Sequence, residues 1–137
     1  MKLKAMWLGA LAALLAGPAF AAEPSAATPP ISQTQLLAKL DAKGADVIVL
    51  DVRTPAEFAA GHVPGAHNIS HDQLAAKLPE LQAWRDKELV LYCRSGRRSA
   101  LAEETLRAAG FTRLLHLEGD YLAWEAEKRP VESSPAQ

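Results

Sequence analysis

The fold is indicated by one stretch, LVLYCRSGRRSALAEETLRAAG, which spans residues 89–110. Its first four residues are apolar and predict a buried strand, and the next six predict a tight turn. An apolar-periodic run then ends at Gly110, which predicts a helix that stops there. Cys93, the only cysteine of the chain, lies at the join between strand and helix.

A thiol at this join can serve as a nucleophile. The backbone N–H groups and the positive dipole end of the following helix stabilise an anion, so a thiol there ionises more readily. The loop is completed by Arg94, Ser95, Gly96, Arg97 and Arg98. We interpret it as a thiolate that receives an anionic substrate, although a lone cysteine after a strand can also be a small buried hydrophobe.

The first 21 residues have the pattern of a secretory signal peptide. Lys2 and Lys4 precede an apolar run that reaches Gly17, and Ala19-Phe20-Ala21 matches a cleavage site. We therefore expect cleavage after Ala21 and a periplasmic location, with no membrane attachment afterwards. An uncleaved membrane anchor is the alternative, for which the apolar run is short.

Length and charge indicate a single domain that does not bind nucleic acid. Removing 21 of the 137 residues leaves 116, enough for one domain, and losing Lys2 and Lys4 changes 15 basic residues to 13 against 16 acidic ones. The resulting net charge of −3 gives no indication of nucleic-acid binding, and the positive charge is local to the Cys93 loop. An exported cysteine without a partner cysteine in its chain indicates a reactive thiol or an intermolecular bond.

Helices and strands alternate along the rest of the chain. Residues 22–30 predict a disordered linker, residues 31–131 one domain, and residues 132–137 a flexible tail. Helices are predicted from Ser32 to about Ala42, over 54–60, from Ser70 to about Lys77, and over 121–127; strands are predicted over 47–52, 66–69 and 113–117. An irregular stretch is expected between Lys77 and Asp86. This order favours an open, mostly parallel α/β sheet, in which Asp51 and Cys93 both follow strand ends and can share a crevice.

Capping residues support the predicted helix starts. The spacing of a capping box occurs at Ser32–Gln35, Thr54–Glu57 and Ser70–Gln73, and Asp120 can cap the last helix. His62, His67 and His71 have spacings that invite a metal interpretation, but a structural role is favoured and no metal is expected.

Three motifs give the chain a resemblance to a known family over about residues 31–131. They are Asp51-Val52-Arg53 with Glu57-Phe58 and the run from Gly61 to Ala66, then the loop from Cys93 to Ser99, and then Leu117-Glu118-Gly119 leading to Tyr121 and Trp124. In this order they resemble a single-domain rhodanese of the exported bacterial type. The resemblance implies a rhodanese-like open parallel sheet of five strands, flanked by helices on both faces.

The resemblance also implies an activity. In such a sulfurtransferase Cys93 would attack the outer sulfur of thiosulfate or a similar anionic donor and become a persulfide, and a thiol or cyanide would then accept the sulfur. No cofactor is implied, a protein acceptor is possible, and a monomer is expected. Arg94 and Arg97 would contact the donor, whereas Arg98 would turn inward to an acid near a strand end, for which Asp51, next to Arg53, is the candidate.

One departure and two alternatives remain open. Members of the family often have a second glycine where this chain has Asp120, which would disfavour dianionic donors if it faced the pocket instead of capping the helix. A cysteine phosphatase or arsenate reductase has five residues between cysteine and arginine, whereas four separate Cys93 from Arg98. A persulfide carrier or redox partner module is the other alternative.

Overall fold

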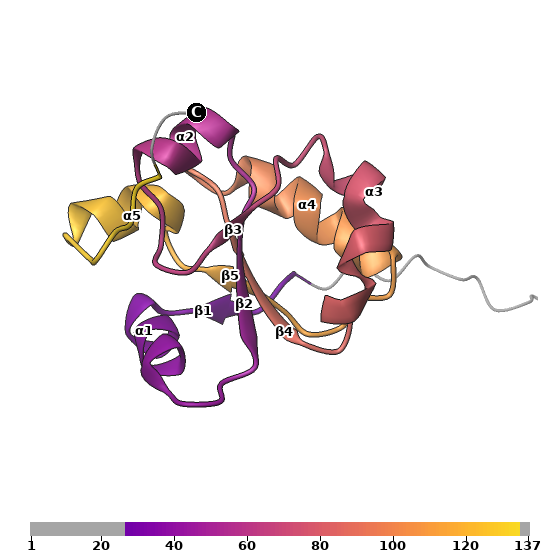
Figure 1. Cartoon of the computed structure of the whole chain (residues 1–137), viewed down its shortest axis with the longest axis horizontal. Helices are drawn as coiled ribbons and strands as arrows, with labels where there is room; N and C mark the ends of the chain where they lie inside the picture. Colours follow the sequence, from indigo (N-terminus) through magenta and orange to yellow (C-terminus); the bar gives the residue numbers. More distant parts are fainter. Residues whose placement is uncertain (1–26, 135–137) are drawn as a thin grey trace, which may run out of the picture.

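The computed structural model describes residues 27–134, so the predicted signal peptide lies outside the described residues. A five-stranded parallel sheet forms the centre, with strand order β1-β5-β4-β2-β3 (Figure 1). In chain order the elements are β1 (Pro30–Ile31), α1 (Gln33–Asp41), β2 (Val47–Asp51), α2 (Pro55–Ala60), β3 (His67–Asn68), α3 (Leu74–Lys77), η1 (Leu78–Trp84), β4 (Glu88–Tyr92), α4 (Arg97–Ala108), β5 (Leu114–Leu117) and α5 (Asp120–Ala126).

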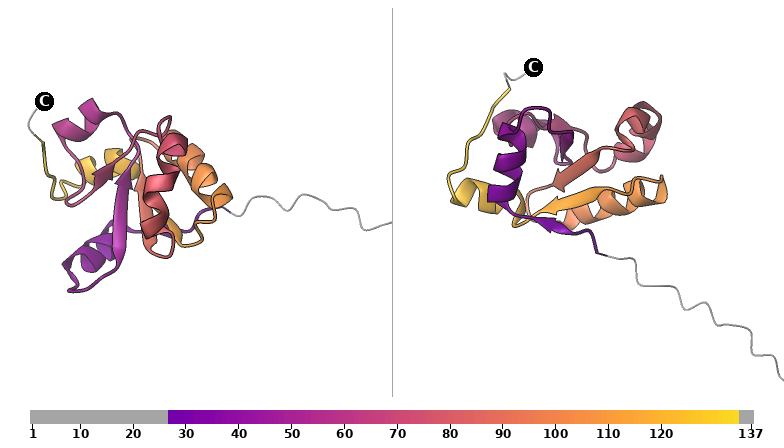
Figure 2. Two further views of the ribbon diagram at one scale, coloured as in Figure 1. Left: turned by 45° about the vertical axis from the view of Figure 1, so that its right-hand side comes forward. Right: turned by 90° about the horizontal axis from the view of Figure 1, so that it is seen from below.

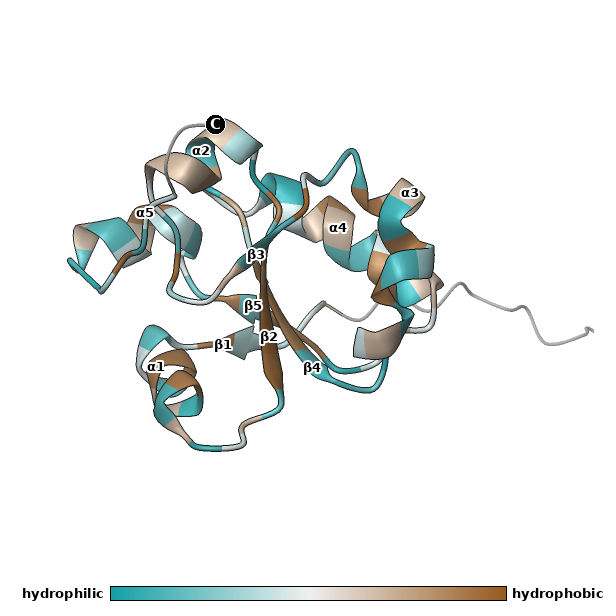
Figure 3. Ribbon diagram, in the orientation of Figure 1, coloured by the Kyte–Doolittle hydropathy of each residue, from teal (hydrophilic) through white to brown (hydrophobic). Residues whose placement is uncertain are grey.

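The central strands β2 and β4 are apolar because helices cover both of their faces. On one side of the sheet lie α1 and α5, and on the other lie α3 and α4 (Figure 1). Figure 2 shows α4 running along the sheet beside β5. The most hydrophobic ribbon is accordingly that of the sheet interior, while the helices present polar residues outward (Figure 3). The predicted fold class, an open parallel sheet with helices on both faces, is confirmed.

Two core layers follow from the alternation of side chains along each strand. In β4, Leu89 and Leu91 pack in the layer that contains Leu106 of α4. Val90 and Tyr92 point the other way, into the layer that contains Trp124 of α5. Cys93 directly follows the carboxyl end of β4, and the loop that it begins leads into α4.

Two of the three predicted capping boxes are present. The side chains of Ser32 and Thr54 each accept the backbone N–H of the third helical residue, and the side chain of that residue accepts the backbone N–H of the cap. The start predicted at Ser70 is wrong: α3 begins at Leu74, because the Ser70 carbonyl accepts the Gln73 N–H in a turn. The stretch expected to be irregular contains the 3₁₀-helix η1.

The domain extends further at both ends than the sequence indicates. Pro30, assigned to the linker, pairs with His116 in β1 and β5, and the Pro29 carbonyl accepts the His116 N–H. At the other end, Glu132 exchanges two backbone hydrogen bonds with His62, and the Ser134 N–H donates to Ala59. The predicted flexible tail is therefore attached to the domain as far as Ser134. No helix within residues 27–134 is both long and apolar enough to cross a bilayer.

Candidate active site

Cys93 lies directly after β4, and its side chain is buried, with 1% of the residue exposed. The Gly96 N–H donates to Sγ at 3.0 Å, and the Ser99 hydroxyl lies 3.5 Å from the same sulfur. Gly96 has φ of +110°, which a residue with a side chain rarely adopts, so the glycine allows the tight turn that brings its amide onto the sulfur. The loop thus supplies hydrogen-bond donors to Sγ, as a thiolate or persulfide requires.

The start of α5 holds the loop from the other side. The Tyr121 N–H donates to the Cys93 carbonyl at 3.0 Å, and the Leu122 N–H donates to the Arg94 carbonyl at 3.1 Å. These two hydrogen bonds attach the start of the loop to the first turn of α5. Arg94, Ser95 and Arg97 are exposed along the loop, where their side chains can meet an incoming molecule.

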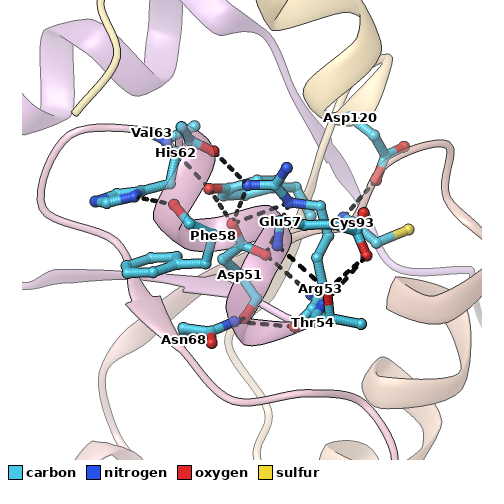
Figure 4. A network of polar contacts seen from close by, with 12 residues as sticks. Asp51, Arg53, Thr54, Glu57, Phe58, His62, Val63, Asn68, Cys93 and Asp120 are labelled. Carbon is cyan, nitrogen blue, oxygen red and sulfur yellow. Dashed lines mark hydrogen bonds and ion pairs between the residues drawn. The ribbon is translucent and has the colours of Figure 1, made fainter. Parts of the chain in front are cut away.

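Asp120 does not cap α5, contrary to the prediction. Gly119 occupies the cap position without a side-chain hydrogen bond, and Asp120 is the first helical residue, buried with φ of +54°. Its Oδ1 accepts the Cys93 N–H at 2.9 Å (Figure 4). The carboxylate therefore lies against the loop, on the protein side of Cys93.

Arg98 pairs with Glu57 rather than with Asp51, which corrects the sequence-based choice. Its Nη1 and Nη2 donate to the two oxygens of Glu57 at 2.7 and 3.0 Å. These hydrogen bonds from Arg98 are the main reason that the pKa of Glu57 falls to about 2. Glu57 was assigned only a capping role from the sequence, although its place in the first motif was a signal for more.

Asp51 is fully buried, and both of its carboxylate oxygens accept hydrogen bonds from residues other than Arg98. Arg53 Nη2 and the Tyr92 hydroxyl donate to its Oδ2 at 2.6 and 2.7 Å, and the Arg53 N–H donates to Oδ1 at 2.9 Å. Burial, then the nearby Asp51 charge, raises the pKa of Tyr92. The Cys93 sulfur points away from this network (Figure 4), so the fully buried Asp51 does not share a crevice with the thiol, whereas Arg53 lines a cavity beside the loop.

His116 and Glu103 are functional candidates that the sequence reasoning missed. Nδ1 of His116 lies 2.5 Å from Glu103 Oε1, and Nε2 lies 2.9 Å from Asp120 Oδ2. Each ring nitrogen thus has an acidic side chain as its hydrogen-bond partner, an arrangement that favours the protonated imidazole. The hydrogen bonds to Asp120 and Glu103 raise the pKa of His116 to about 10. Glu103 is the seventh residue of α4 and is buried.

A cavity of about 220 Å³ lies beside the loop, between α2 and α5. Its lining combines charged and apolar side chains and includes one residue of the loop: Arg53, Glu57, Ala60, Gly61, Arg94, Tyr121, Leu122 and Glu125. The cavity adjoins the loop at Arg94, and Cys93 is not among its lining residues.

Two of the histidines considered for metal binding, His62 and His67, contact other residues. His62 Nδ1 lies 2.7 Å from the Phe58 carbonyl oxygen, with the two rings stacked, and His67 contacts Trp84 on the sheet edge. Within residues 27–134 no group of three histidine, cysteine or acidic side chains is arranged to hold a metal ion.

A buried cysteine that receives a loop amide at the end of a parallel strand, beside arginines, defines an α/β protein whose loop thiol is placed as a candidate nucleophile. Residues 32–127 match the rhodanese-like domain. The chain belongs to the rhodanese-like family.

Relatives and solved structures agree with this assignment. The chain is 37% identical to a sulfurtransferase of Allochromatium vinosum, over 63% of this chain and 78% of the relative. It is 33% identical to the thiosulfate sulfurtransferase GlpE of Pseudoalteromonas translucida, over 70% and 88% of the two chains. A crystal structure of a rhodanese-related protein from Thermoplasma volcanium matches with a TM-score of 0.65 and 32% identity, covering 76% of this chain and 97% of that one. Some other relatives are longer, and the chain spans 46% of a Synechocystis protein.

Proposed function

We propose that this protein is a sulfurtransferase in which Cys93 accepts a sulfur atom from a small anionic donor and passes it to a thiol. The observation that carries the proposal is the hydrogen bond from the Gly96 N–H to Sγ at 3.0 Å, in a loop with Arg94 and Arg97 exposed. A thiolate needs such donors to be stable, and the same donors stabilise the persulfide that replaces it.

The reaction runs in two displacements. In the first, the Cys93 thiolate attacks the outer sulfur of the donor, a new S–S bond forms, and the old bond breaks with its electron pair leaving on the donor remnant, which is sulfite for thiosulfate. In the second, an acceptor thiolate attacks the outer sulfur of the Cys93 persulfide and restores the Cys93 thiolate. Neither step needs an external oxidant or reductant.

The loop size supports sulfur chemistry over phosphate chemistry. Four residues separate Cys93 from Arg98, and the Arg98 guanidinium is bonded to both carboxylate oxygens of Glu57. A phosphoryl group presents three equatorial oxygens and needs an arginine that faces them. Turnover of an aryl phosphate comparable to that of thiosulfate would contradict the assignment.

Mass spectrometry of the intact protein tests the proposal. Incubation with thiosulfate is expected to add one sulfur atom to Cys93, and addition of a thiol is expected to remove it with formation of a new persulfide. Cys93→Ser is expected to gain no sulfur. Loading without release to any thiol or cyanide would instead indicate a persulfide carrier, and no loading with any donor would contradict both functions.

A periplasmic location is part of the same proposal, because residues 1–21 have the pattern of a signal peptide. Expression in a bacterium with an export system, followed by N-terminal sequencing of the periplasmic fraction, should give a chain that starts at Ala22. A chain that retains Met1 in the cytoplasm would contradict export.

A further inference from the structure

Asp120 places a fixed carboxylate against the inner side of the catalytic loop. Its Oδ1 accepts the Cys93 N–H at 2.9 Å (Figure 4). Its Oδ2 would lie 3.2 Å from a Cβ added to Gly96. It is only 4% exposed and is held with φ of +54°, a conformation that residues other than glycine rarely adopt. The side chain is therefore fixed beside both the cysteine and the residue whose amide meets the sulfur.

Two further titratable groups complete what we call the buried charge cluster: Glu103 of α4, His116 of β5 and Asp120 of α5. His116 lies between the two acids, with Nδ1 at Glu103 and Nε2 at Asp120. With His116 protonated, the formal charges of two acids and one base sum to −1. Because this charge is buried, ions of the solvent screen it poorly.

The other charges near Cys93 do not cancel that of the cluster. Arg98 is already paired with both oxygens of Glu57. Arg94 and Arg97 are exposed, so water and salt weaken their attraction for an anion. In addition, Asp120 occupies the Cys93 N–H, which is then not available to an oxygen of the donor.

We propose that Asp120 is a specificity-determining residue that makes the loop favour sulfur donors with a single negative charge over the dianion thiosulfate. This inference rests on the proposed transfer of sulfur to Cys93. A fixed negative charge repels a dianion about twice as strongly as a monoanion at the same distance. The favoured class comprises organic thiosulfonates and organic persulfides, which carry their one charge on or near the sulfur that is transferred.

Both kinds of donor react by the same displacement. With an organic thiosulfonate, the Cys93 thiolate attacks the outer sulfur, the S–S bond to the sulfonyl group breaks, and the electron pair leaves with an organic sulfinate. With thiosulfate the leaving group is sulfite. Each reaction ends with the Cys93 persulfide, so a comparison of the two donors isolates the effect of charge on the first step.

The ratio of kcat/KM for methanethiosulfonate to that for thiosulfate tests the inference. Asp120→Asn keeps an oxygen for the Cys93 N–H and removes the charge, so the ratio is expected to fall at least fivefold, mainly through a lower KM for thiosulfate. Asp120→Gly suits the positive φ and should shift the ratio in the same direction. His116→Gln removes the cation beside Asp120 and should raise the ratio at least threefold.

His67→Gln is the matched control, because His67 lies on the edge strand β3, separated from β5 by β4 and β2. Its ratio should equal that of the unaltered protein. A ratio that stays within twofold in both Asp120 variants would overturn the inference, since a merely structural role changes both donors alike. A His116→Gln ratio that falls would also overturn it. If neither donor loads Cys93 in the unaltered protein, the proposed function fails and this inference with it.

Discussion

The Arg98 guanidinium donates to both carboxylate oxygens of Glu57, although the two residues lie 41 positions apart in the chain. Arg98 is in the first turn of α4, directly after the Cys93 loop, and Glu57 is in the first turn of α2. The pair therefore fixes the end of the loop to the helix that follows β2, and it leaves Arg94 and Arg97 as the exposed arginines of the loop.

Glu57→Gln should lower the free energy of unfolding by an amount that depends on pH. Because its folded pKa is about 2, below the ordinary 4.5, the stabilisation from the Glu57 carboxylate is present above pH 4.5 and is lost as the pH falls toward 2. We expect a loss of about 1 kcal/mol at pH 7, since the pair is partly exposed. Urea unfolding from pH 7 to pH 3 should show the two proteins converging, whereas exposed Glu104→Gln should match the parent throughout. A constant difference would reject the assignment.

Cys93→Ser should abolish sulfur transfer and leave the fold intact. The serine oxygen can still accept the Gly96 N–H, so the change in unfolding free energy should stay within about 1 kcal/mol. Activity should fall by about three orders of magnitude or more, because an alcohol is not ionised at neutral pH. Sulfite release and thermal unfolding measure the two effects. Activity above about 1% of the parent would show that another group receives the sulfur.

Arg94→Ala and Arg97→Ala should each impair binding of an anionic donor more than the chemical step. We expect KM for thiosulfate to rise about tenfold with kcat changed less than threefold, as for a lost binding contact. Steady-state kinetics at low salt provide the measurement. Arg113→Ala is the control. Arg113 directly precedes β5 and donates to the Asp86 carbonyl, at the amino ends of the strands, whereas Cys93 lies at the carboxyl end of β4. An unchanged KM in both variants would exclude these arginines from donor binding.

Asp51→Ala should destabilise the protein strongly. The change leaves the buried Arg53 charge without its partner, which costs about 3–5 kcal/mol. Tyr92→Phe removes the hydroxyl bonded to Asp51 and to the Val63 N–H and should cost about 1–3 kcal/mol. Urea unfolding of both single variants and the double variant should show that the two losses are not additive. Additive losses would mean that Asp51 and Tyr92 act independently.

His116→Gln should show the opposite pH dependence from Glu57→Gln. The folded pKa of His116 is about 10, above the ordinary 6.5, so its stabilisation is fully present below pH 6.5 and is lost as the pH rises through 10. The variant should be less stable by about 2 kcal/mol near pH 6, and the difference should shrink toward pH 10. Unfolding curves at several pH values test this, and ¹⁵N shifts of a neutral ring at pH 7 would contradict it.

Local signals accounted for most of the fold. The apolar runs of β2 and β4, the capping boxes at Ser32 and Thr54, and the turn with Gly96 each act within a few residues, so they can be recognised without the rest of the chain. Ser70 shows the limit of this reasoning, because a capping spacing is also compatible with a turn. The two-residue strand β1 carried no signal of its own, since its pairing with β5 is made by residues 85 positions away or more.

The sequence alone was enough to recognise one cysteine that follows a buried strand, precedes a helix and has arginines around it. It could not predict which charged side chains pair, because each pairs with the partner that packing brings near it. That is why Arg98 found Glu57 in place of Asp51, and why Asp120 joined His116 and Glu103 beneath the loop in place of capping α5. These pairings join α2, α4, β5 and α5, which lie far apart in the chain, so the charge around Cys93 depends on how those four elements pack.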